Sequence, residues 1–168
     1  MVDKGKFHMK TIYLMLLVHE QKVSWRKLLY HIVARPRALI TLWLVCHERL
    51  ATRGRLHHLG MVDKKECNFC AKEETVQHLF FECDKLKTIW RNILKWIQVV
   101  HEPGGWESEI KWLIPYCKGK GKKSDIMKLA IAETVYKIWH YRNEVSFGQS
   151  VNNTNIEDRI INTIIYRA

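Results

Sequence analysis

The chain has 168 residues, 47% of them hydrophobic, so it is long and apolar enough for one globular domain, and disorder is not expected. Its 28 lysines and arginines outnumber its 17 acidic residues, which gives a formal net charge of +11. This excess favours a polyanionic partner, nucleic acid before an acidic membrane, although a merely soluble basic protein would carry the same charge.

The amino terminus has part of the pattern of a secretory signal peptide. The apolar run 11–18 follows three lysines, Lys4, Lys6 and Lys10. However, the polar residues 19–22 come next without a small-residue cleavage site, and the run is too short to cross a bilayer. We interpret the run as a buried helix or strand. We therefore expect an intracellular protein, nuclear or cytoplasmic, that is not secreted.

Upstream of the cysteine cluster, apolar residues at helical spacing predict three helices. The first, 24–33, begins with a serine that can cap it and ends before Pro36, because a residue preceding proline avoids helical dihedral angles. The second begins at Pro36 and is apolar on nearly all sides, so we expect it to be central, with Cys46 as a core cysteine. The third, 52–59, has a threonine cap and ends at a left-handed Gly60.

The stretch 67–83 holds four candidate metal ligands with the spacing C-x2-C-x7-H-x4-C, namely Cys67, Cys70, His78 and Cys83. A two-residue gap lets a tight turn point two thiolates at one place, and a short helix over 76–81 would bring the imidazole and the last thiolate to it. Three thiolates and one imidazole fill the tetrahedral positions that Zn²⁺ prefers and leave none for a catalytic water. We therefore predict one structural zinc ion.

Other interpretations of these residues stay open. Cys67 and Cys70 can be ordinary cysteines with His78 on a helix surface, or a redox pair, although no thioredoxin-like strand precedes them. Disulfides would need an oxidising compartment, and five cysteines leave one over. His57 and His58 are spare imidazoles that could replace His78, but they precede the cysteines.

Downstream of the ligands, an apolar stripe predicts a helix over 86–97, and a shorter helix runs from 106 to 114 and ends at Pro115. The sequence 118–123 consists of four lysines and two glycines, which predicts a flexible loop that is rich in positive charge. It can contact phosphates through point charges or serve as a nuclear localisation patch, but a linker is the preferred interpretation.

The last third of the chain predicts two helices. Ser124 or Asp125 is expected to cap the longest helix of the chain, and Gly148 closes it. Thr154 and Glu157 form a capping box for a final helix with an isoleucine stripe. This stripe can complete the core, form a dimer seam, or belong to a helix cut from a downstream domain.

These elements predict a mainly α-helical domain with a small embedded CCHC zinc-binding module. We divide the chain into an N-terminal helical lead-in (1–35), the zinc-binding module with its flanking helices (36–100), a linker with the basic loop (101–123) and a C-terminal helical pair (124–168).

Basic residues gather around the predicted metal loop. The candidate nucleic-acid contacts are Arg49, Arg53, Arg55, Lys64, Lys65 and Phe69. The cations would contact phosphates and Phe69 would stack on a base, as aromatic side chains do in modules that bind single strands. A solvated basic face explains the same cations equally well.

The segment from Pro36 to Trp90 resembles the zinc-binding region that follows the reverse transcriptase in plant LINE-type (non-LTR) retrotransposons. Its most specific part is the ligand block with Glu74-Thr75 and His78-Leu79-Phe80-Phe81. Other matching pieces are Leu42-Trp43-Leu44, Arg49-Leu50-Ala51-Thr52, Arg55-Leu56, Gly60, and further on Ile138-Trp139, Arg142-Asn143 and Phe147. The resemblance implies the four zinc ligands and a region that helps to hold template RNA or target DNA. No reverse transcriptase, endonuclease or ribonuclease H domain fits in the chain.

We therefore expect a non-enzymatic protein. The first hypothesis is a module that binds single-stranded or structured RNA or DNA with low sequence specificity, in which zinc is structural. The alternative is a domesticated protein-interaction scaffold, with a protein partner or a dimer formed through the C-terminal helices. The acidic residues are scattered, and neither a nucleophile elbow nor a nucleotide-binding loop is present, which argues against an enzyme. No membrane association is expected.

Overall fold

The computed structural model describes residues 23–148 and 155–168, and these form seven α-helices and one π-helix. In chain order they are α2 (Arg26–Leu29), α3 (Pro36–Cys46), α4 (Arg53–His58), η1 (His78–Glu82), α5 (Lys87–Trp96), α6 (Trp106–Cys117), α7 (Lys122–Ser146) and α8 (Ile156–Arg167). The predicted apolar element 11–18 and Thr154 of the predicted capping box lie outside the described residues.

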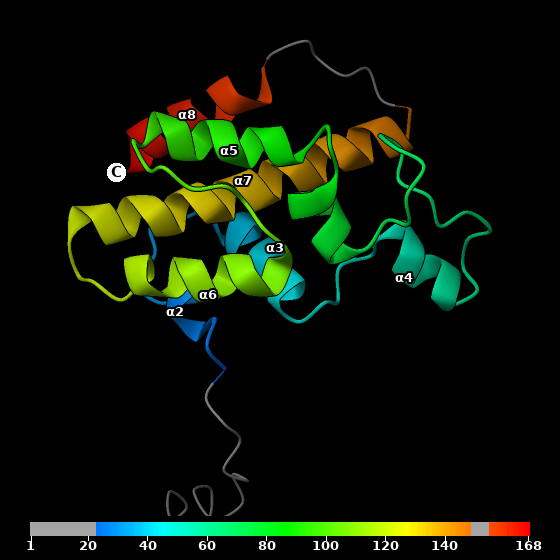
Figure 1. The fold of residues 1–168 in the computed structure, drawn as a ribbon, viewed down its shortest axis with the longest axis horizontal. Coiled ribbons are helices and arrows are strands. Elements are labelled where there is room, and N and C mark those ends of the chain that lie inside the picture. Colours follow the sequence, from blue (N-terminus) through cyan, green and yellow to red (C-terminus); the bar gives the residue numbers. More distant parts are fainter. Residues whose placement is uncertain (1–22, 149–154) are drawn as a thin grey trace, which may run out of the picture.

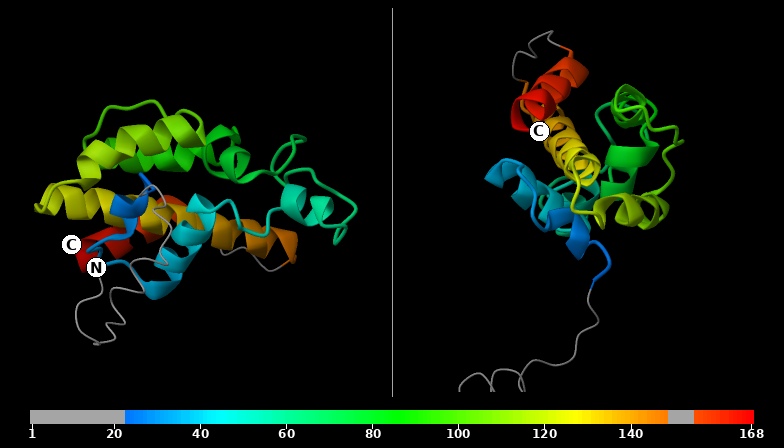
Figure 2. Two further views of the ribbon diagram at one scale, coloured as in Figure 1. Left: turned by 90° about the horizontal axis from the view of Figure 1, so that it is seen from below. Right: turned by 90° about the vertical axis from the view of Figure 1, so that its left-hand side faces the viewer.

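Helix α7 is the longest helix of the described residues and lies at their centre (Figure 1). Its 25 residues correspond to a length of about 38 Å. Helices α3, α5, α6 and α8 all pack against it, and Figure 2 shows them around it from two further sides. Its middle turns are fully buried, including Ala130, Ile131 and Ala132, because neighbours cover it on several sides.

The helices around α7 each turn one apolar stripe inward. In α5 the buried residues are Ile89, Trp90, Ile93 and Leu94. In α8 they are Ile160 and Ile164, which face α5 and α7, while Ile165 is exposed. Of the three roles predicted for the isoleucine stripe, the structure shows that most of it completes the core of this chain.

The predicted fold class is confirmed. The described residues contain no β-strand, only an isolated antiparallel bridge between Glu66 and Glu73. The predicted cap of α4 is present, since Thr52 Oγ1 accepts a hydrogen bond from Arg55 N at 3.4 Å. Gly60 ends that region with a left-handed φ of 67°. None of the helices in the described ranges is long and apolar enough to span a bilayer.

Two helix ends differ from the prediction. Helix α2 ends at Leu29 instead of continuing to residue 33, and the chain turns at His31, whose φ is 52°. Helix α6 does not stop before Pro115 but continues to Cys117. A proline in the last turn removes only one hydrogen bond close to the helix end, so the helix can pass through it.

The start of α7 also differs from the prediction. The helix begins at Lys122 with Gly121 as its N-cap, so the predicted cap at Ser124 or Asp125 is wrong. Ser124 is instead buried within the first turn. The predicted basic loop is therefore shorter, because its last two lysines belong to the helix. At the last helix, Asn155 supplies the cap, since its side chain accepts a hydrogen bond from the second residue of α8.

Candidate metal centre

The first two candidate ligands lie on a tight loop, residues 66–74, which we call the metal loop. The antiparallel bridge closes this loop, and Cys67 N donates to Lys72 O at 2.8 Å. Within the loop, the backbone N–H of Phe69 donates to Cys67 Sγ at 3.5 Å. The two-residue gap between the cysteines therefore forms the turn that the spacing predicts.

The other two candidate ligands lie at the two ends of η1. His78 begins this π-helical turn, and Cys83 follows it directly, with Cys83 N donating to His78 O at 2.7 Å. The helix predicted over 76–81 is therefore present, since residues 76–77 are α-helical and η1 continues to Glu82, but its last turn is wider than an α-helix. Thr75 Oγ1 accepts a hydrogen bond from His78 N at 3.0 Å and fixes the start of the turn. Single π-helical turns are frequent at functional sites.

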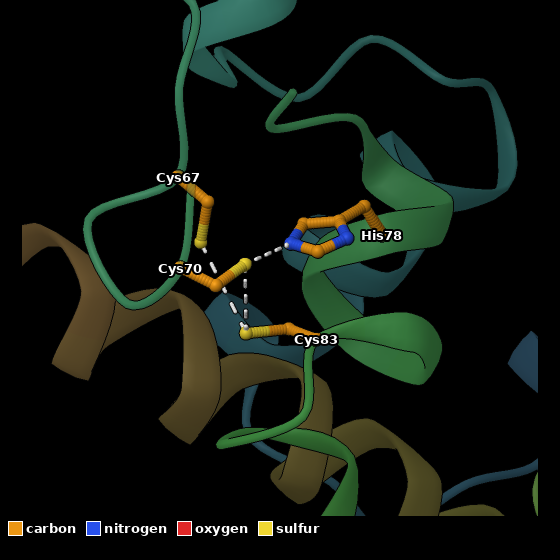
Figure 3. A group of neighbouring side chains, drawn as sticks. All are labelled: Cys67, Cys70, His78 and Cys83. Carbon is orange, nitrogen blue, oxygen red and sulfur yellow. Dashed lines mark hydrogen bonds between the residues drawn. The ribbon is translucent and has the colours of Figure 1, made fainter. Parts of the chain in front are cut away.

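The four side chains converge on one point (Figure 3). Cys83 Sγ lies 4.0 Å from Cys67 Sγ and 4.0 Å from Cys70 Sγ, and Cys70 Sγ is 3.1 Å from His78 Nε2. All four donor atoms lie within 4.8 Å of one another. Zinc–sulfur bonds of about 2.3 Å in a tetrahedron put sulfurs about 3.8 Å apart, so the donor set fits a zinc ion. Thiolates and imidazole also favour zinc over harder cations.

The thiols of Cys67 and Cys83 share a hydrogen bond that shifts their two pKa values in opposite directions. This bond, helped by the backbone N–H groups of Lys85 and Leu86, lowers the pKa of Cys83. The same bond and burial raise the pKa of Cys67. One thiolate is therefore stabilised by the protein alone, and a bound cation would displace the proton of the other thiol.

The remaining cysteines and spare histidines lie away from this cluster. All five cysteines are free, and burial raises the pKa of both Cys46 and Cys117 to about 12, so these two remain thiols near neutral pH. Cys46 is a core residue, as predicted. His57 and His58 are exposed on α4 and do not join the donor group.

A buried ion pair joins the metal loop to the C-terminal end of α7. The side chains of Glu74 and Arg142 are 0% and 5% exposed, and Arg142 Nη2 lies 2.5 Å from Glu74 Oε1. Arg142 Nε also donates to both carboxylate oxygens at 3.1 Å. The same carboxylate accepts a hydrogen bond from Arg53 N at 2.8 Å, at the start of α4. Glu74 therefore connects α4, the metal loop and α7.

Sequence reasoning did not find this pair, although both residues belong to the pieces that carry the family resemblance. The partners are 68 residues apart, so no local pattern joins them. The sequence showed only that one of those pieces contains an acidic residue and another a basic residue, which does not indicate that the two side chains are in contact.

Two further contacts fix the metal loop on α7. The amide of Asn68 donates to Ser146 Oγ at 2.5 Å. The ring of Phe69 stacks on Tyr141 with 5.3 Å between centroids and 22° between planes. The loop is also tight against α4, where a Cβ added to Gly54 would lie 2.8 Å from Glu74 O.

The candidate nucleic-acid contacts occupy different environments. Arg49, Arg55, Lys64 and Lys65 are exposed and Arg53 is half-buried. Arg53 and Arg55 donate to the backbone oxygens of Glu66 at 3.2 Å and Glu48 at 3.3 Å, and Lys65 pairs with Glu73 at 3.3 Å. Phe69 is half-buried, and one face of its ring is covered by Tyr141. None of these contacts tests nucleic-acid binding, so it stays a prediction.

Fold and site together define a helical protein with a closed group of three cysteines and one histidine that can hold a metal ion. Residues 7–90, half of the chain, match the family described as zinc-binding in reverse transcriptase. The chain therefore belongs to this family of reverse transcriptase zinc-binding regions, and that part of the resemblance is confirmed. No curated protein and no solved structure matches the chain.

Proposed function

We propose that the chain is a non-catalytic module that one structural zinc ion stabilises and that binds nucleic acid. We further propose that it derives from the reverse transcriptase region of a plant LINE-type retrotransposon and acts in the nucleus or cytoplasm. Family membership and the converging donor group support the zinc part of this proposal. A reducing compartment is consistent with it, because zinc needs free thiolates.

Cys67, Cys70, His78 and Cys83 would hold the ion. When bound, zinc would cross-link the metal loop to η1 and contribute folding free energy. Three thiolates and one imidazole complete the tetrahedron, so no position remains for a water that the metal could activate. This supports a structural role for the ion.

The observation that carries the nucleic-acid part is the net charge of +11. Neutralisation of phosphates by lysine and arginine releases counterions, so binding should weaken steeply with salt and depend little on sequence. Arg49, Arg53, Arg55, Lys64 and Lys65 are the proposed phosphate contacts near the metal loop, whereas the ring of Phe69 packs on Tyr141.

Two measurements test the proposal. The first is zinc per chain on protein refolded with zinc, for which one equivalent is expected. The second is fluorescence anisotropy of a labelled, mixed-sequence single-stranded RNA, titrated with the zinc-loaded protein at salt between about 50 and about 200 mM. A logarithmic plot of affinity against salt should fall with a slope of about −0.7 for each phosphate contacted. Absence of binding at the lowest salt would refute the nucleic-acid part and leave the zinc part standing.

The scaffold hypothesis predicts a different result in the same experiments. A stable dimer or protein complex that salt does not weaken, together with no RNA binding, would favour it. Sedimentation of the zinc-loaded protein at low and high salt separates the two hypotheses, because only apolar association persists when charges are screened.

A further inference from the structure

A second basic surface lies at the other end of α7 from the metal centre. Residues of α2, the end of α6 and the first turns of α7 line a cleft of about 1040 Å³. In Figure 1 these helix segments lie in the left-hand half of the picture. Among the residues that line it are the basic side chains Arg26, Lys27, His31, Lys118, Lys120 and Lys128. In the described part of the chain, Asp125 is the carboxylate among its lining residues. We call this surface the basic cleft.

Two cations of the basic cleft are held in place by neighbouring side chains. Arg26 lies over the ring of Tyr30, 4.6 Å from its centroid, and donates to its hydroxyl at 2.8 Å. The side chain of Lys128 is 6% exposed, and its Nζ is 3.8 Å from Asp125 Oδ1. A cation that is already ordered loses less conformational entropy when it binds an anion. The exposed lysines Lys27, Lys118 and Lys120 add charge around these two.

The two ends of α7 differ in how completely their charges are balanced. Among the described residues that line the basic cleft, five lysine and arginine side chains share one carboxylate. Around the metal loop, six such cations (Arg49, Arg53, Arg55, Lys64, Lys65 and Lys72) share four exposed carboxylates (Glu48, Asp63, Glu66 and Glu73). The cleft therefore carries the larger unbalanced positive charge, and a concave surface with low-dielectric walls focuses such a field.

The chemistry of the cleft favours binding over reaction. Cys117 lines it, but burial raises the pKa of this thiol to about 12, so it is not a nucleophile at neutral pH. A concave basic surface also fits a flexible phosphodiester strand better than the flat surface of a membrane.

The geometry points to the basic cleft as the main phosphate-contacting surface of this protein, with the backbone of a single-stranded RNA as its ligand. This inference rests on the proposed nucleic-acid binding and names the surface that supplies most of its salt dependence. The cations near the metal loop then contribute a smaller share.

Two triple variants test the inference. K27A/K118A/K120A removes three exposed lysines from the cleft, and K64A/K65A/K72A removes three exposed lysines from the metal end. Each lowers the net charge by the same amount, so a general charge effect is equal in both. We expect the cleft variant to lose more than about tenfold in affinity for the labelled RNA and to reduce the salt slope by about 2, the value for three lost contacts. The metal-end variant should lose about threefold or less.

The outcomes separate this inference from the proposed function. If wild-type protein binds RNA with salt dependence but the metal-end variant loses as much affinity as the cleft variant or more, the cleft inference is wrong and the proposed function stands. If wild-type protein does not bind RNA, both the cleft inference and the nucleic-acid part of the proposed function are wrong. Binding of wild-type protein to phosphatidylserine-containing vesicles in place of RNA would also overturn the inference. Circular dichroism and zinc content confirm that both variants keep the wild-type fold.

Discussion

The polar side chains at the two ends of α7 differ in whether they are paired within the protein. At the C-terminal end, Arg142 is buried and gives its N–H groups to Glu74, and Ser146 receives the amide of Asn68. At the N-terminal end, the cations of the basic cleft outnumber their carboxylate. Burying an unpaired charge is costly, whereas an exposed unpaired charge is tolerated. The first end is thus organised to hold the chain on itself, and the second has positive charge left for an external anion.

A second comparison concerns two ion pairs that each join α7 to another part of the chain. Arg142 of α7 pairs with Glu74 at the metal end, and Glu133 of α7 pairs with Arg35, the residue before α3. Glu74 and Glu133 are both fully buried, but Arg35 is 29% exposed where Arg142 is 5% exposed. These pairs are matched controls for each other, because only one of them contacts the metal loop.

Loss of a metal ligand should have the largest effect, and it should be confined to one end of α7. Cys70→Ser is expected to reduce zinc binding and to remove much of the folding free energy of the metal end alone, where zinc contributes on the order of 10 kcal/mol in small zinc peptides. Hydrogen exchange should show lost protection over residues 53–83 and retained protection in the middle of α7. The measurements are zinc per chain and exchange before and after chelation.

The matched control for this variant is Cys46→Ala, which removes a thiol outside the cluster. It should keep one zinc per chain, although it leaves a small cavity in the core. Equal loss of protection along all of α7 on chelation would contradict a local role for the metal. Full zinc binding by the C70S protein would exclude Cys70 as a ligand.

The next largest effect is expected from breaking the two ion pairs. Glu74→Gln leaves Arg142 buried without its charge partner, which should cost about 3–5 kcal/mol of unfolding free energy. Glu133→Gln should cost less, because Arg35 can reach solvent. The distinguishing measurement is metal affinity: E74Q and R142K should weaken binding of Co²⁺, followed by its visible spectrum, by about tenfold, as for other residues that position metal ligands.

Metal affinity should be unchanged in E133Q and R35K at a temperature where all four proteins are folded. A parallel loss of affinity in both pairs would mean that general stability, and not the link from Glu74 to the loop, sets the affinity. Urea denaturation gives the stability of each variant independently.

The features that the sequence predicted correctly are local. The turn between Cys67 and Cys70, the threonine cap of α4 and the apolar stripe of α5 each lie within a few turns, where the local pattern of the chain decides the structure. The helix boundaries that were predicted wrongly depend on which of two nearby residues ends or caps the helix. Pro115 lies close enough to the end of α6 to be tolerated, and Gly121 displaces the predicted serine cap of α7. The width of η1 was not predictable, because α- and π-turns differ little over one turn.

The features that the sequence missed depend on the tertiary fold. Neither the pairing of Glu74 with Arg142 nor the basic cleft follows from any window of the sequence. The cleft combines α2 with the turn after α6, about 90 residues later, and only their packing brings Lys27 near Lys118. Net charge predicted a polyanionic partner, but it did not show where the unbalanced charge gathers.

A smaller effect should distinguish the packing at the two ends. Gly54→Ala introduces a Cβ that would lie 2.8 Å from Glu74 O, and we expect a net loss of about 1–3 kcal/mol even though alanine favours a helix. Gly119→Ala, beside the basic cleft, would meet its nearest heavy atom at 3.6 Å and should change stability by less than about 1 kcal/mol. Thermal unfolding of the zinc-loaded proteins measures both. A stabilised G54A protein would show that the metal loop is not tightly packed on α4.

The smallest effect is expected at the aromatic stack, and it decides what Phe69 does. In a double-mutant cycle of Phe69→Ala and Tyr141→Ala, the coupling energy should be about 0.5–1.5 kcal/mol, the usual value for an aromatic pair. If the ring only holds the loop on α7, both single variants should lower RNA affinity by the same small factor. If Phe69 also stacks on a base, F69A should lose about 1–3 kcal/mol of binding energy that Y141A retains. Because Tyr141 covers one face of the Phe69 ring, we expect the first result, with the metal end fixing the fold and the basic cleft contacting RNA.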